Sequence, residues 1–190
     1  MPERPSAPPD PPPSDGTVAL RSWGEADLPA LLRACNGDED LAYWLDFLPQ
    51  PYTEDSARQY LAANDAGWRG DRLETPLAIA DAADGAALGS VALFWHEPEQ
   101  GVAEIGYWVG RDARGRGVAT RALRLAAAWV LGDLAFERLE LRADPRNEPS
   151  TRVAEKAGFT FEGVLRSAHT NARDGRRVDY AVYSLLRAEL

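Results

Sequence analysis

The chain has 190 residues, 45% of them hydrophobic, and a formal net charge of −9. This length and apolar content suit one domain with its own core, and no stretch reaches the roughly 18 apolar residues of a membrane span. The acidic charge argues against nucleic-acid binding, since neutralising phosphates takes basic clusters, and it is compatible with a cationic substrate. The single cysteine, Cys35, excludes an intrachain disulfide and fits the reducing cytoplasm, and two widely separated histidines argue against a metal site.

Residues 1–16 are predicted to form a disordered, proline-rich leader to a domain over residues 17–190. The segment Met1–Pro13 holds half of the 14 prolines and lacks the apolar core of a secretory signal. So polar and proline-rich a segment does not pack well. The leader is therefore expected to be dispensable for folding, and a large loss of thermal stability on its deletion would contradict this.

The first half of the domain is predicted to be one strand followed by helices. Thr17–Trp23 alternates apolar and polar residues, as a strand does. A helix then begins at Ser22 or Gly24 and reaches about Cys35, and a short amphipathic segment, Glu39–Phe47, ends before Pro49. Thr53 is expected to cap a helix that reaches about Trp68.

The second half alternates strands with two helices. The predicted strands are 76–80, 86–95, 103–109, 136–143, 159–168 and 177–186, with Asp174-Gly175 as a hairpin turn. The predicted helices are 117–131, which ends at Gly132, and one that Ser150 caps and Gly158 ends. This order predicts a single α/β (α+β) domain, with a mixed, mostly antiparallel sheet of about six to seven strands flanked by helices.

A strand that runs into a glycine-rich loop and then a helix is the most informative segment. Backbone N–H groups at a helix start have no intrahelical partner and attract anions, and Gly115 and Gly117 let the backbone approach a phosphate. Arginines at 111, 114, 116, 121 and 124 place five positive charges in 14 residues. The pattern predicts a pyrophosphate site, against the alternative of an ordinary turn with exposed arginines. It fits neither a P-loop, which needs a lysine, nor a dinucleotide fingerprint, because Thr120 stands at the last glycine position.

These residues resemble the GNAT superfamily of N-acetyltransferases, whose hallmark [Q/R]-x-x-G-x-[G/A] matches Arg114-Gly-Arg-Gly-Val-Ala119. The ribosomal-protein N-terminal acetyltransferase branch, called Rim-like, resembles the chain most. The segments that carry this likeness are Glu104-Ile-Gly-Tyr-Trp108, Asn147-Glu-Pro-Ser150, Val153-Ala-Glu-Lys-Ala-Gly-Phe159, Glu162-Gly-Val-Leu-Arg166, and Asp179 with Tyr183-Ser-Leu-Leu186.

The resemblance implies a sheet splayed open after the 103–109 strand, with acetyl-coenzyme A as cosubstrate and no metal. The 114–120 loop would contact the pyrophosphate, and Asn147 and Ser150 would lie near the pantetheine and the thiol. The N–H groups of Trp108–Gly110 are candidate oxyanion and pantetheine donors. The cofactor-binding residues expected from the whole argument are Trp108, Val109, Gly110, Arg111, Arg114, Gly115, Arg116, Gly117, Val118, Ala119, Thr120, Asn147 and Ser150.

Acetyl transfer needs a base for the amine and an acid for the leaving thiolate. Glu104, in an otherwise apolar strand, is the candidate base, directly or through water; the alternatives are an outward-facing residue or one that only binds the substrate ammonium. Ser150 is the candidate acid, with a plain helix cap as the alternative. Many family members carry an acidic tyrosine four residues before the helix-ending glycine, where this chain has Ala154.

Trp44, Tyr107 and His169 are candidate substrate-binding residues, although aromatic side chains more often belong to the core. Cys35 has no nearby histidine, so a buried structural role is favoured over a covalent one. The acceptor is interpreted as the α-amine of a protein or peptide, with a small amine such as an antibiotic or polyamine as the alternative. A noncatalytic coenzyme A-binding module is a third possible function. The protein is also expected to form a homodimer through its two last strands.

Overall fold

The structure is a computed structural model that describes residues 2–190. Seven strands form one sheet in the order β1-β2-β3-β4-β5-β7-β6, and only the β4–β5 pair is parallel. The strands are β1 (Val18–Arg21), β2 (Glu74–Asp81), β3 (Ala87–Glu97), β4 (Val102–Val109), β5 (Arg138–Ala143), β6 (Thr160–Thr170) and β7 (Arg177–Leu186). The predicted mixed, mostly antiparallel sheet is confirmed.

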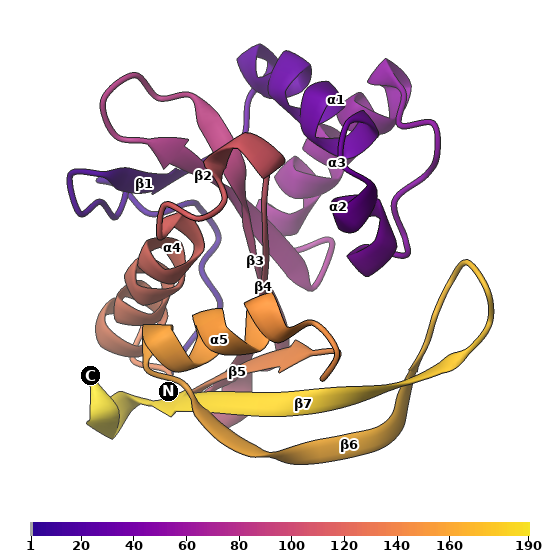
Figure 1. Ribbon diagram of the computed structural model, residues 1–190. Helices are drawn as coiled ribbons and strands as arrows, with labels where there is room; N and C mark the ends of the chain where they lie inside the picture. The colour runs from indigo at the N-terminus through magenta and orange to yellow at the C-terminus, as the bar shows by residue number, and fades with distance from the viewer. Residues whose placement is uncertain (1) are drawn as a thin grey trace.

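Five α-helices flank the sheet in two groups. They are α1 (Leu28–Asn36), α2 (Glu39–Trp44), α3 (Glu54–Trp68), α4 (Val118–Ala127) and α5 (Glu148–Ala157). Figure 1 shows α1, α2 and α3 gathered together and α4 beside α5 in a separate group. Within residues 2–190, no helix combines the length and apolar character needed to cross a bilayer.

Each group of helices packs on its own face of the sheet, because side chains alternate along a strand. In β2, Leu77 and Ile79 belong to the core cluster that includes the α4 residues Val118 and Ala122. Ala78 between them belongs to the cluster of Leu31 and Cys35 on α1. The sheet therefore separates an α4–α5 face from an α1–α3 face.

The sheet opens between β4 and β5. These strands pair only over Val102–Glu104, so the rest of β4 has no partner along that edge. Because β4 pairs with β3 as far as Val109, the open edge is bounded on one side by a fixed strand. The splayed sheet expected from the resemblance is confirmed, and the opening begins at Glu104.

Most predicted elements are confirmed within two or three residues, and two details are wrong. Ser150 does not cap α5: Asn147 is the N-cap, and its side chain accepts the Ser150 N–H at 3.2 Å. Gly132 does not end the helix that begins with α4, because α4 continues as a π-helical turn, Ala128–Asp133, that closes with Leu134 N–H donating to the Trp129 carbonyl.

The proline-rich leader contacts the domain at several points. The Arg4 guanidinium donates to the carbonyl of Gly67, the carbonyl of Pro13 accepts the N–H of Leu20 at 2.9 Å, and Asp15 pairs with Arg121 at 2.6 Å. Met1 lies outside the described residues. That the leader is dispensable for folding stays a prediction, which the thermal stability of a chain lacking residues 1–13 tests.

Gly89 of β3 lies so close to the backbone of β4 that there is no room for a side chain. A β-carbon there would clash with the carbonyl oxygen of Trp108 and come within 2.9 Å of the Cα of Val109. We expect Gly89→Ala to lower the free energy of unfolding by about 1–3 kcal/mol, since two paired backbones would have to separate. Gly24→Ala is the control in chemical denaturation, because a β-carbon there meets no atom of residues 2–190 within 4 Å. Equal stability of the two variants would contradict the expectation.

Candidate active site

The loop between β4 and α4 presents a run of free backbone donors. Gly115 and Gly117 take left-handed φ values of 74° and 75°, and Gly117 is the N-cap of α4. Within residues 2–190, no acceptor is found for the N–H groups of residues 115–120; the first helical bond is from Arg121 to Gly117. Consecutive free N–H groups at a helix start form an anion site.

The five arginines predicted for this loop separate into two groups. Arg114 donates to both carboxylate oxygens of Asp38 and to the Val109 carbonyl, so its charge fastens the loop to the start of α2. The side chain of Asp38 is 1% exposed. Arg121 pairs with Asp15, and Arg124 donates to the carbonyl of Lys156. Of these five arginines, Arg111 and Arg116 have no ion pair or side-chain hydrogen bond within residues 2–190, so these two remain for an anion.

Glu104 lies where the sheet begins to open. Its carboxylate is 3.4 Å from Nε of Arg142, and its side chain is 22% exposed. Burial raises the pKa of Glu104 above its usual value, and Glu140 adds to the rise, while Arg142 and His96 oppose it. A carboxyl group with a raised pKa at the edge of an opening is suited to accept a proton near neutral pH.

Tyr107 and Ser150 join β4 to α5 across the opening. The Tyr107 hydroxyl donates to Oγ of Ser150 at 3.2 Å. Burial raises the pKa of Tyr107, so the phenol stays protonated at neutral pH. Tyr107 packs against the core of the α4–α5 face, where Ser150 also lies. The sequence did not pair these two residues.

The backbone of β4 directs donors into the opening in alternation. The N–H of Gly110 donates to the carbonyl of Leu88 on β3 at 2.9 Å. Because backbone N–H groups alternate in direction along a strand, the N–H of Trp108 also points toward β3. Neither group is therefore available in the opening as a donor. The N–H groups of Tyr107 and Val109 face the opposite edge, where β5 no longer pairs. Val109 thus remains a candidate donor, and Tyr107 joins it.

Hydrogen bonds link the α2–α3 connection to the β6–β7 hairpin. The Asp46 carboxylate bonds Nε2 of His169 at 3.0 Å and the N–H of Ala172 at 2.7 Å, and Arg173 donates to the carbonyls of Asp46 and Leu48. The His169 ring stacks on Tyr180 at 5.5 Å. His169 therefore helps to join two segments, and Trp44, which packs against Tyr43, lines neither of the two cavities described next.

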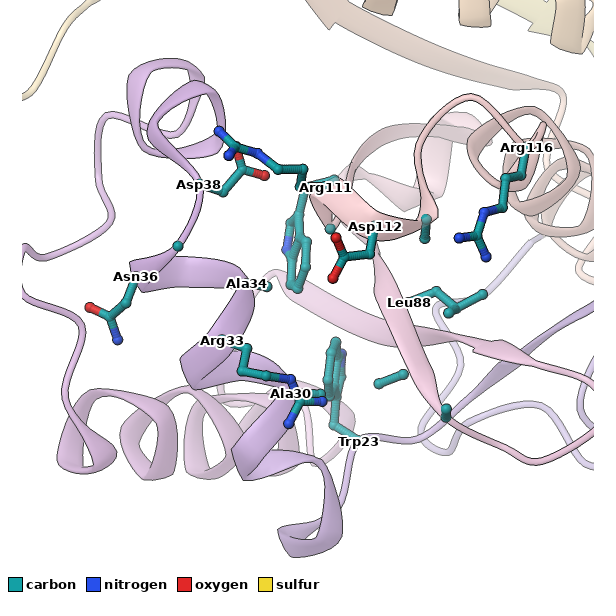
Figure 2. Close-up of a pocket in the computed structure, with 16 residues that line it drawn as sticks. Trp23, Ala30, Arg33, Ala34, Asn36, Asp38, Leu88, Arg111, Asp112 and Arg116 are labelled. Atoms are coloured by element: carbon teal, nitrogen blue, oxygen red, sulfur yellow. The ribbon is translucent and has the colours of Figure 1, made fainter.

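Two cavities adjoin Trp108 on the α1–α3 face. The larger measures about 710 Å³ and lies between α1 and the ends of β3 and β4 (Figure 2). The smaller measures about 140 Å³ and is bounded by α1, the α2–α3 connection, α3 and β4. Apolar side chains line most of the smaller one: Leu31, Leu45, Phe47, Leu48, Ala92 and Phe94.

Comparison with known proteins assigns the family. A profile described as Acetyltransferase (GNAT) domain matches residues 17–160. YdaF of Bacillus subtilis, whose name places it among ribosomal N-acetyltransferases, is 32% identical over 78% of this chain and 79% of its own. The chain belongs to the GNAT acetyltransferase family.

Two further similarities cover most of the domain. The spermidine N(1)-acetyltransferase of Escherichia coli is 28% identical over 80% of this chain and 78% of its own. The structure of Mycobacterium smegmatis RimJ in complex with CoA-disulfide superposes with a TM-score of 0.80 at 26% identity, covering 91% of this chain and 83% of that one. The chain is a GNAT N-acetyltransferase, an acyltransferase enzyme, and the noncatalytic alternative is set aside.

The residues of this GNAT enzyme fit a coenzyme A thioester. The free N–H groups at 115–120, with Arg111 and Arg116 beside them, suit a pyrophosphate, and the open edge of β4 supplies backbone donors for an amide-containing arm. Bound acetyl-coenzyme A supplies an acetyl group activated as a thioester. The sequence did not predict that Tyr107 bonds to Ser150. The alternation of side chains along β4 does place Tyr107 and Glu104 on opposite faces of the strand, since they are three residues apart.

Proposed function

We propose that this acetyltransferase modifies the α-amine at the N-terminus of a protein or peptide. The apolar cavity of about 140 Å³ beside Trp108 carries the proposal. Its volume suits one amino-acid side chain, and the strand that lines it at Gly106–Trp108 also carries Glu104 two residues earlier. Phe47 at its wall is 70% exposed and offers a contact for an apolar side chain.

The charges around the opening support a peptide over a polyamine. A polycation needs several unpaired carboxylates. Glu104 is near Arg142, Asp144 pairs with Arg146, and Asp46 is engaged by His169 and Ala172. Among the residues that line the cavity, Glu74 is the single carboxylate, and it has no ion pair within residues 2–190. An α-amine needs only modest help, since its pKa is about 7.7–8.0 and a neutral fraction exists at physiological pH. One base and one apolar pocket are sufficient for such an acceptor.

Proton movement in the proposed reaction uses two groups on opposite faces. The neutral amine attacks with its nitrogen lone pair to form the new C–N bond, and Glu104 takes the proton that this nitrogen then loses, directly or through a water. The N–H groups of Tyr107 and Val109 stabilise the carbonyl oxygen, which gains negative charge as the amine adds to the carbonyl carbon and loses it when the C–S bond breaks. Tyr107 donates a proton through Ser150 to the leaving sulfur, so the phenol takes the role that the family tyrosine leaves vacant at Ala154.

A panel of acceptors tests the acceptor class. We expect kcat/KM for peptides with a free apolar N-terminal residue to exceed that for spermidine by about tenfold or more, since burying a side chain is worth about 1.5–3 kcal/mol. Ala92→Phe, which fills the cavity, should remove the preference and leave acetyl-coenzyme A binding intact. Ala83→Phe in the exposed turn between β2 and β3 is the matched control, because Ala83 lines neither cavity. A preference for spermidine would overturn the peptide assignment and favour the small-amine alternative, which the likeness to spermidine N(1)-acetyltransferase supports.

We further propose that catalysis needs no metal ion, since the reaction described above uses only side chains, backbone donors and the thioester. Turnover should survive dialysis against a chelator. A loss of turnover that a divalent metal restores would contradict the absence of a metal requirement. The proposed compartment is the cytoplasm, because a chain with one cysteine fits a reducing environment.

A homodimer through β6 and β7 is supported by the exposed apolar residues Phe161, Val164 and Leu165. A monomer by sedimentation at micromolar concentration would refute it.

A further inference from the structure

Glu74 is a carboxylate in the wall of the apolar cavity that the proposed reaction does not use. It is the first residue of β2, is half-buried, and lines the cavity of about 140 Å³ together with Ala92 and Phe94. Burial raises the pKa of Glu74, and the positive charge of Arg72 opposes this rise. Within residues 2–190, no ion pair or hydrogen bond engages its carboxylate. Burying part of a carboxylate without a partner is unfavourable, so Glu74 is suited to a partner that enters the cavity.

Strand register places Glu74 on the same face of the sheet as Glu104. Glu74 of β2 is opposite Phe94 of β3, and Phe94 is opposite Glu104 of β4. Residues directly opposite on neighbouring strands point the same way, and Ala78, four residues along β2 from Glu74, packs on the α1–α3 face. Two strand spacings put the Cα atoms of the two glutamates about 10 Å apart. An acceptor whose amine lies at Glu104 can therefore direct its first side chain toward Glu74.

Apolar groups lie between the two carboxylates. The ring of Phe94 reaches over β4, since a β-carbon on Gly106 would be 3.5 Å from Cε2 of Phe94. Among the residues that line the cavity, Glu74 is the only charged one. The hydroxyl groups of Tyr60 and Ser90 lie 3.0 Å apart and already bond to each other. An acceptor side chain in this cavity thus meets apolar walls along its length and one carboxylate that lacks a donor.

We propose that Glu74 selects the first residue of the acceptor by accepting a hydrogen bond from a neutral N–H or O–H donor on its side chain. The inference rests on the proposed peptide acceptor and names the residue that this acceptor begins with: one with a polar tip in place of a purely apolar one. A neutral donor fits better than an ammonium group. Removing a full charge from water is expensive, and one carboxylate in an apolar cavity repays that cost only with further hydrogen bonds.

Two peptides that differ only in beginning with asparagine or leucine test it, because these two side chains have nearly the same shape. The wild type should have the higher kcat/KM for the asparagine peptide. In Glu74→Leu the ratio of kcat/KM for the asparagine peptide to that for the leucine peptide should fall about tenfold or more, as expected for one hydrogen bond to a charged group. Glu74→Gln should keep part of the preference, since its amide oxygen still accepts. A loss of stability cancels in this ratio, because both peptides meet the same enzyme.

Glu97→Leu is the matched control, because Glu97 is an exposed strand residue that lines neither cavity, and it should leave the ratio unchanged. An unchanged ratio in Glu74→Leu, or an equal fall in Glu97→Leu, would overturn the role of Glu74 and leave the peptide acceptor in place. A peptide beginning with lysine that surpasses the asparagine peptide, with its advantage lost in Glu74→Leu, would overturn the neutral donor. Turnover of spermidine with neither peptide acetylated would overturn the proposed function and this inference together.

Discussion

Replacing Gly117 by glutamate is expected to abolish acetyl-coenzyme A binding, with affinity lowered about 100-fold or more, which corresponds to ~2.7 kcal/mol. Gly117 is the N-cap of α4 and lies among the N–H groups 115–120 that have no acceptor in the described chain. A carboxylate there would occupy the anion site with its own charge and repel the pyrophosphate. Calorimetric titration of the folded variant measures the loss.

Gly175→Glu is the matched control for backbone strain. Gly175 has φ 71°, against 75° for Gly117, and a β-carbon at either position meets no atom of residues 2–190 within 4 Å. Both variants thus share a cost of about 1 kcal/mol for a side chain at positive φ. Gly175 lies in the turn between β6 and β7 and lines neither of the two cavities. Equal loss of binding in both variants, or no loss in Gly117→Glu, would mean that the loop does not hold the pyrophosphate.

Local signals made most of the fold predictable from the sequence. Thr53 caps α3 by accepting the N–H of Ser56, and Gly158 ends α5 in the left-handed conformation, as their residue types indicate. The glycine-rich loop before α4 was predictable for the same reason, since its glycines and the following helix are adjacent in the chain. The predicted cap at Ser150 was wrong because Asn147, three residues earlier, offers the same hydrogen bond, and only the backbone conformation decides between them.

Contacts between distant residues were not predictable. Arg114 and Asp38 are 76 residues apart, Tyr107 and Ser150 are 43 apart, and His169 and Asp46 are 123 apart. No periodicity or spacing connects such pairs, because the splayed sheet brings them together. These contacts also change the interpretation of single residues: Arg114 fastens the loop, and Tyr107 becomes a proton donor candidate. The sequence therefore predicts candidate residues one at a time, and the structure shows which of them contact one another.

Glu104→Gln is expected to lower kcat by about 100-fold or more while acetyl-coenzyme A binds as before, since general base catalysis contributes about 10²–10⁴ in rate. Glutamine keeps the size of the side chain and removes its proton acceptor. Steady-state kinetics with a peptide acceptor measures the effect. If Glu104 only binds the substrate ammonium, KM rises and kcat changes little. That outcome would refute the role of base and favour the alternative.

The pH dependence gives Glu104 a second, independent signature. The base works when deprotonated, so kcat/KM of the wild type should fall as pH drops through the raised pKa of Glu104. Arg142 lowers this pKa and Glu140 raises it. Arg142→Gln should therefore move the acid limb to higher pH, and Glu140→Gln should move it to lower pH, since removing each neighbour reverses its effect. A residue that merely packs the strand would leave the limb unmoved in both, so opposite shifts from two neighbouring substitutions would identify the titrating group as Glu104.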